Sequence, residues 1–173
     1  MDEDKEKGLS RIEKFVRKHF KDFEQHIVQE KDLSIILLKG HLLIEYYLEH
    51  LVLLFFDKSK KVSKMGFYGK VCALREKNVF NVGVEKHLLE LNDVRNSLAH
   101  RLDFQISTYE IDKIGYNMGK DYILKKLDLE VGSSNSTKEL LIWVISEIAS
   151  DVYVPVISKV ILLERESAKT GGK

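Results

Sequence analysis

Cysteine and proline are nearly absent from this sequence, since each occurs once in 173 residues, as Cys72 and Pro155. A single cysteine excludes an internal disulfide framework and a CxxC metal or redox pair, and it fits a reducing compartment. One proline and ten glycines leave few interruptions to regular secondary structure. We therefore expect long, continuous elements in a protein of the cytoplasm.

An excess of charge of one sign is also missing. The 28 basic and 27 acidic side chains give a net charge of +1, which does not by itself indicate a nucleic-acid or membrane partner. The first residues are densely charged, unlike a secretory signal. Residues 33–56 are the most apolar stretch, but five polar side chains interrupt it, so we expect no membrane span. These side chains are Lys39, His41, Glu45, Glu49 and His50.

Motifs for nucleotide-dependent and nucleophile-triad chemistry are missing too. The sequence has no GxGxxG, no phosphate loop ending in Gly-Lys-Ser/Thr and no GxSxG turn. No glutamate has a histidine three residues later, as the di-iron sites of helical bundles require. His41 and Glu45 share a helix face. They are either two metal ligands or, as we favour, a polar pair that fixes helix register or an interface, so we expect no metal site and no cofactor.

The sequence does have helical periodicity. Apolar residues recur at spacings of three and four through most of the chain, and no strand-like alternation of useful length occurs. The pattern predicts an all-α protein with a single domain, residues 1–173. The first four expected helices cover residues 9–28, 32–56, 63–77 and 82–104. One or two short helices follow within 109–127, with a break near Gly115 to Gly119. We expect a C-terminal helix over 136–168 that is kinked or broken near Pro155.

Local signals place some helix ends. Asp32 is suited to cap the second helix, and Ser107 followed three residues later by Glu110 has the form of a capping box. The second helix is apolar nearly all round, so we expect it at the centre of the fold or at a subunit interface.

The stretch RNSLAH, residues 95–100, breaks the amphipathic pattern of the fourth helix. On an ideal wheel Arg95 lies in the middle of the apolar stripe, and His100 lies about 140° away from it. A buried guanidinium is costly unless it is paired or opens onto a cleft. Either the helix distorts or ends near His100, or a second copy in a two-fold dimer completes the site. The stripe itself consists of Val84, Leu88, Leu91, Leu98 and Leu102.

The residue types of this stretch suit phosphate chemistry. Histidine exchanges a proton near neutral pH, arginine matches phosphate oxygens with its forked donors, and an amide such as Asn96 can orient either one. RNA supplies both a nucleophile, its 2′-hydroxyl, and the adjacent phosphodiester. Arg95, Asn96 and His100 are therefore candidate catalytic residues for a metal-independent cleavage of RNA that leaves a 2′,3′-cyclic phosphate.

Arg95, Asn96 and His100, with four residues between the arginine and the histidine, resemble the signature of the HEPN superfamily (higher eukaryotes and prokaryotes nucleotide-binding). The segments LLKGHLLIEYYLEHLV, MGFYGKVCALRE and LNDVRNSLAHRL, within residues 33–102, resemble that family in the same order. The resemblance implies an up-and-down bundle of four core helices with additional C-terminal helices. It also implies a homodimer formed through the motif helix, and an endoribonuclease of toxin–antitoxin or abortive-infection type, with an antitoxin or regulatory protein as partner.

A non-catalytic alternative stays open. The sequence has Leu102 where a HEPN subgroup carries a tyrosine two residues after the histidine, which puts that subgroup's regulation in doubt. Other proteins with this bundle, such as regulators resembling the mannitol repressor family, bind partners without cleaving RNA. In that case Arg95 forms a buried ion pair with Asp93, Glu90 or an acid on another helix, and His100 bonds backbone at a helix end.

Residues 57–77 hold seven basic and two acidic side chains, a local charge of +5. Such lysines either form an ordinary solvated face or, if they flank the motif, steer RNA toward it. The candidate RNA-binding residues are Lys58, Lys60, Lys61 and Lys64.

Overall fold

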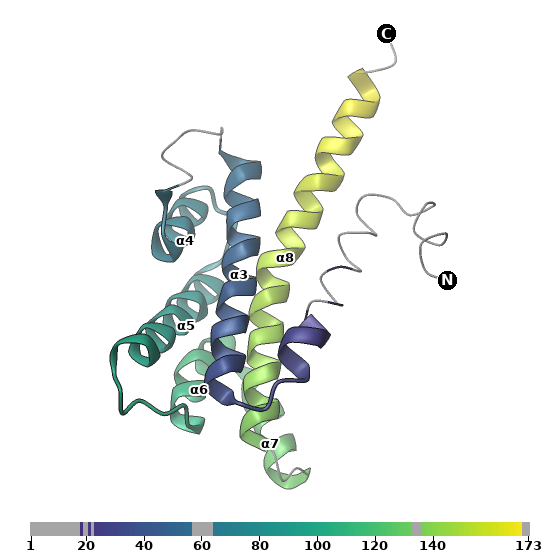
Figure 1. Ribbon diagram of the computed structural model, residues 1–173. Helices are drawn as coiled ribbons and strands as arrows, with labels where there is room; N and C mark the ends of the chain where they lie inside the picture. Colours follow the sequence, from purple (N-terminus) through teal and green to yellow (C-terminus); the bar gives the residue numbers. More distant parts are fainter. Residues whose placement is uncertain (1–17, 19–20, 22, 57–63, 133–135, 171–173) are drawn as a thin grey trace, which may run out of the picture.

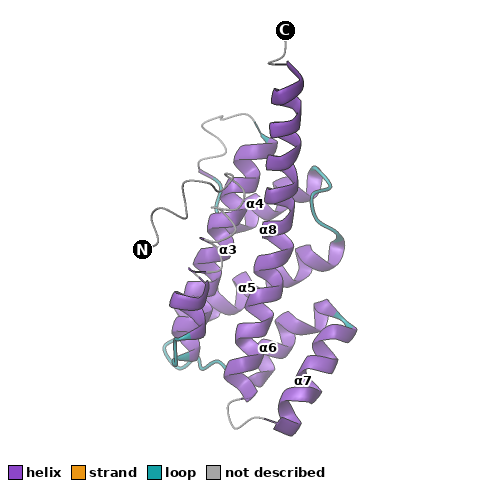
Figure 2. Ribbon diagram, turned by 90° about the vertical axis from the view of Figure 1, so that its right-hand side faces the viewer, coloured by secondary structure: helices purple, strands orange, loops and turns teal. Residues whose placement is uncertain are grey.

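The structure is a computed structural model that describes residues 18, 21, 23–56, 64–132 and 136–170. Every regular element within these residues is helical, as the periodicity predicts (Figure 2). The helix expected over 9–28 lies largely outside the described residues. In chain order the elements are a π-helical turn η1 (Glu24–Val28), α3 (Leu33–Phe55), α4 (Phe67–Glu76), α5 (Val82–His100), α6 (Thr108–Gly115), a 3₁₀ turn η3 (Tyr116–Met118), α7 (Lys120–Gly132) and α8 (Ser136–Thr170).

Helices α3 and α8 form the centre of the fold and run side by side in the same direction (Figure 1). The ring of Tyr47 lies 5.4 Å from that of Tyr153. Further along both helices, the Nζ of Lys159 lies 5.2 Å from the centre of the Phe55 ring. The two helices run parallel because the helices between them return the chain to the end where α3 begins. The up-and-down order of four core helices stays a prediction.

The close approach of α3 to α8 depends on Gly40. A Cβ atom at this position would lie 2.7 Å from two side-chain carbons of Ile145, which is inside the van der Waals contact distance. Glycine therefore lets the two helix backbones pack more closely than any other residue could.

Helix α3 begins where the sequence predicts. The Asp32 carboxylate accepts hydrogen bonds from the backbone N–H groups of Ser34 at 2.8 Å and Ile35 at 3.1 Å, which is an N-cap. The helix is central, as its all-round apolar pattern predicts, and packs against η1, α4, α5 and α8. One apolar stripe nevertheless stays exposed, formed by Ile35, Leu38, Leu42, Tyr46 and Leu53.

Helix α8 continues through Pro155, so of the two outcomes expected there, a kink or a break, the break does not occur. Val152 and Val156, on either side of the proline, are both buried, and this packing holds the helix across the missing N–H bond. Within Ser136–Leu163 an 18-residue window has a mean hydropathy of 1.8, so by length and composition alone the segment could cross a membrane. Half of that window is buried inside the fold.

The segment between α5 and α8 follows its local signals. Ser107 and Glu110 form the predicted capping box at the start of α6. The expected break near Gly115 to Gly119 is also present, because η3 ends at Met118 and is followed by Gly119, whose φ of +72° favours glycine. These short elements pack on α5 and α8 and thereby hold the motif helix in place.

Candidate functional site

Arg95 lies half-buried on α5, beside the buried stripe of Val84, Leu88, Leu91 and Val94. Its Nη1 donates a hydrogen bond to Asn96 Oδ1 at 3.1 Å. Within the described residues no carboxylate pairs with it, so the ion pair considered for Asp93 or Glu90 is not formed. Most N–H donors of this guanidinium therefore have no protein acceptor in the described part of the chain.

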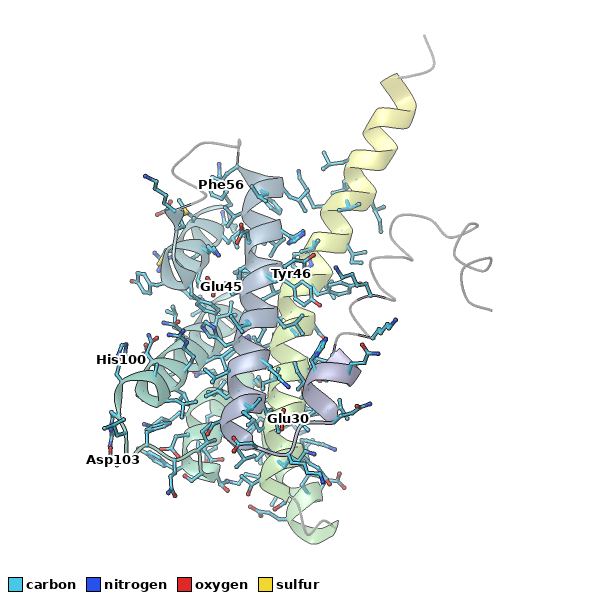
Figure 3. All side chains as sticks on the ribbon, in the orientation of Figure 1. Glu30, Glu45, Tyr46, Phe56, His100 and Asp103 are labelled. Carbon is cyan, nitrogen blue, oxygen red and sulfur yellow. The ribbon has the colours of Figure 1, made fainter. Side chains whose placement is uncertain are left out.

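His100 is the last residue of α5 and is exposed. The helix was expected to reach residue 104, but it ends at His100, and Leu102 beyond it is fully exposed instead of lying on the apolar stripe. Figure 3 shows His100 at the outer end of α5, away from the α3–α8 pair. No hydrogen bond or ion pair among the described residues joins His100 to Arg95. The helix end was one of the outcomes foreseen from the divergent directions of these two residues.

The motif face of α5 contains a further polar residue that sequence reasoning missed. Asn92 precedes Arg95 by three residues and therefore lies on the same helix face. Its Oδ1 lies 3.2 Å from Nε2 of His41 on α3, a histidine only 3% exposed. The His41 ring also stacks on Phe67 of α4, with 4.4 Å between ring centres. The three-residue spacing from Arg95 was the signal that could have identified Asn92.

The protonation of His41 depends on this environment. Burial lowers its pKa below the ordinary 6.5, although the bond to Asn92 and the charge of Glu45 act in the opposite direction. The positive charges of Arg95 and Lys70 lower the pKa further. His41 is thus a neutral imidazole at neutral pH, and it can donate its Nε2–H to the Asn92 oxygen.

No hydrogen bond among the described residues joins His41 to Glu45. Glu45 instead accepts a hydrogen bond from Lys70 on α4 at 3.1 Å, and Glu49, one turn further along α3, accepts another at 3.2 Å. The Lys70 side chain is only 7% exposed. These ion pairs fasten α4 to α3, and Figure 3 shows Glu45 on the side of α3 that faces α4.

The basic segment 57–77 is less cationic than its composition indicates. The two glutamates of α3 neutralise Lys70, and Glu85 neutralises Arg75 through a contact of 2.8 Å. The sequence count missed these acids because they lie outside the segment. Among the candidate RNA-binding residues, Lys64 is exposed, whereas Lys58, Lys60 and Lys61 lie outside the described residues.

No group of three or more histidine, cysteine, aspartate or glutamate side chains in the described part of the chain is arranged to hold a metal ion.

No protein-family model, curated protein or solved structure matches this chain.

Proposed function

We propose that this protein is a metal-independent endoribonuclease of the HEPN type, with Arg95, Asn96 and His100 as its catalytic residues. The observation that carries the proposal is the half-buried guanidinium of Arg95, which has an amide rather than a carboxylate as its partner in the described chain. A cation held in this way keeps donors free for a phosphate. If its role were only structural, it would be expected to pair with a carboxylate.

The proposed reaction is an intramolecular transfer at phosphorus. The 2′-oxygen of RNA attacks the adjacent phosphodiester, the bond to the 5′-oxygen breaks, and a 2′,3′-cyclic phosphate remains. One proton leaves the 2′-hydroxyl and one reaches the departing 5′-oxygen, so protons balance. Arg95 stabilises the charge that develops on the phosphate oxygens, His100 moves a proton, and Asn96 orients the guanidinium.

The proposal includes a homodimer. His100 is exposed at the end of α5, and its direction differs from that of Arg95 by about 140° on the helix wheel. A two-fold related copy of α5 would bring His100 of one protomer toward Arg95 of the other. The exposed apolar stripe of α3, from Ile35 to Leu53, is a second surface that a copy of this chain could cover. Sedimentation equilibrium at micromolar concentration should give twice the chain mass, and a monomer would exclude the shared site.

Cleavage of a mixed RNA by the purified protein, with EDTA present throughout, tests the chemistry. Arg95→Ala and His100→Ala should each abolish cleavage. Two matched variants remove the same residue types elsewhere on the surface: Arg101→Ala next to the motif and His26→Ala on η1, both exposed residues. These controls should retain activity. Wild-type cleavage that stops in EDTA, or that persists in His100→Ala, would contradict the mechanism.

Mixing the two inactive variants tests the shared site separately. If each active site uses Arg95 of one protomer and His100 of the other, a heterodimer of Arg95→Ala with His100→Ala contains one intact site. Activity should then return to about one quarter of the wild-type value, because half of the randomly paired dimers are heterodimers with one of two sites. No recovery after confirmed subunit exchange would place both residues in the same protomer.

The candidate RNA-binding lysines can be tested through salt dependence. Replacing Lys58, Lys60, Lys61 and Lys64 by serine should weaken RNA binding and flatten its dependence on salt, because fewer counterions are released. Lys70→Met should leave the salt slope unchanged, since Lys70 is already neutralised by Glu45 and Glu49. An unchanged slope in the fourfold variant would make these lysines an ordinary solvated face.

A non-catalytic regulator is the second candidate, and one observation favours it. Among the described residues no hydrogen bond or ion pair joins His100 to Arg95, so the two residues do not form a catalytic pair within one chain. A partner protein would then bind the motif face. Absence of RNA cleavage by a confirmed dimer at all salt concentrations would favour this alternative.

A further inference from the structure

A polar cavity of about 250 Å³ lies beside the N-terminal half of α5, away from Arg95 and His100. Three carboxylates line it: Asp121 from α7, and Glu147 and Asp151 from α8. Trp143, one turn before Glu147, forms another part of the wall. The amides of Asn81 and Asn117 complete its polar lining.

The negative charge of this cavity has little compensation among the described residues, where His87, 3.2 Å from Asp151, is the one ion-pair partner of the three carboxylates. Within the described residues no lysine or arginine forms an ion pair with Asp121, Glu147 or Asp151. Burial raises the pKa of Glu147, and the charges of Asp151 and Asp121 raise it further. Like charges gathered in this way repel one another and destabilise the fold unless a cation joins them.

His87 gives a second and independent indication of a ligand. Its ring lines the same cavity, and the residue is only 3% exposed. Its Nδ1 has no hydrogen-bond partner in the described chain, and its Nε2 lies 3.2 Å from Asp151 Oδ2 without the alignment of a hydrogen bond. A buried polar atom without any partner, such as this Nδ1, is unfavourable, and it is expected where a bound molecule supplies the missing contact.

The lining favours an organic cation over a metal ion. Among the described residues these acids and His87 are not arranged to coordinate a metal. An ammonium or guanidinium group needs only hydrogen-bond distances to carboxylates, and the face of an indole such as Trp143 attracts it as well. The cavity volume suits a molecule of a few carbon atoms, since drug-sized ligands occupy larger pockets.

We propose that this cavity is a binding site for a small aliphatic amine or guanidine, held by Asp121, Glu147 and Asp151. The ligand's positive charge removes the repulsion among the three carboxylates. The site lies on α7, α8 and the beginning of α5, so it does not depend on the proposed ribonuclease activity.

Isothermal titration and thermal unfolding with 1,4-diaminobutane test the site. The wild-type protein should bind the diamine saturably and melt at a higher temperature in its presence. 1,4-Butanediol, which has the same length without charge, should do neither. The variant Glu147→Gln/Asp151→Asn should bind at least about tenfold more weakly, as expected when charge-assisted hydrogen bonds are lost. Without ligand this variant should melt at or above the wild-type temperature, because its carboxylates no longer repel.

Asp128→Asn is the matched control, because Asp128 lies two turns along α7 from Asp121 and its side chain is 75% exposed beside Lys125. This variant should bind the diamine like the wild type. Equal binding by the wild type and the double variant would show that the diamine binds elsewhere and overturn the proposal. Binding of Mg²⁺ without binding of the diamine would overturn it too.

Discussion

His41 and Asn92 join the central helix α3 to the motif helix α5. The imidazole Nε2 lies 3.2 Å from the amide Oδ1, between residues 51 positions apart in the sequence. Because Asn92, Arg95 and Asn96 share one face of α5, this contact fixes the rotation of the helix on which the proposed catalytic residues lie.

The first prediction is that stability falls as the pH decreases below about 6.5. The pKa of folded His41 is below the unfolded value of 6.5, so the unfolded chain takes up a proton first. The stability that the neutral imidazole contributes is complete above the unfolded pKa and is lost as the pH falls through the folded pKa. Urea unfolding at about pH 7.5 and about pH 5.5 measures this loss. His41→Gln should reduce the pH dependence, whereas replacement of the exposed His26 should not.

A second prediction concerns the effect of the Arg95 charge on the pKa of His41. The guanidinium charge lowers the pKa of this histidine, so Arg95→Ala should raise it, because protonation is no longer opposed by a nearby cation. Titration of the histidine side-chain signals by NMR measures the change. Arg101→Ala, at the exposed end of the motif, is the control and should leave the His41 pKa unchanged. No shift in Arg95→Ala would mean that the guanidinium is turned away from α3.

The third prediction concerns the ion pairs of Lys70. Lys70→Met should lower the free energy of unfolding by about 1–3 kcal/mol, because two charge-assisted hydrogen bonds to Glu45 and Glu49 are lost. Both glutamates are partly exposed, at 31% and 55%, so solvent limits the cost. Lys64→Met, in an exposed position, should change stability by less than about 0.5 kcal/mol. Chemical denaturation measures the free energy of unfolding of both variants. Equal losses in the two would show that Lys70 is an ordinary solvated side chain.

The fourth prediction addresses the contact between α3 and α8. Gly40→Ala should destabilise the protein by about 1–3 kcal/mol, because the added methyl overlaps Ile145, although alanine favours a helix by about 1 kcal/mol. In an Ile145→Ala background the clash is gone, and the same substitution should be neutral or stabilising. A double-mutant cycle from urea unfolding tests this coupling. Additive effects would show that the helices do not meet at these residues.

Local signals in the sequence predicted most of the secondary structure of the described residues. The spacing of apolar residues predicted the helices, Asp32 and Ser107 predicted two helix starts, and Gly119 marked a break, because each of these depends on neighbouring residues alone. The helical wheel of the motif helix placed Arg95 on the apolar stripe and His100 on a different face. Packing decided between the alternatives that the local rules left open. Buried Val152 and Val156 keep α8 continuous through Pro155, and α5 ends at His100, beyond which Leu102 is exposed.

Only the tertiary structure decided which distant residues meet. The parallel pairing of α3 with α8, the bond of His41 to Asn92 and the neutralisation of Lys70 by Glu45 all join segments that sequence spacing cannot relate. The acidic cavity likewise combines Asp121 with Glu147 and Asp151 across two helices. Sequence periodicity fixes which face of a helix is apolar, but the partner of that face depends on how all the helices fill one core.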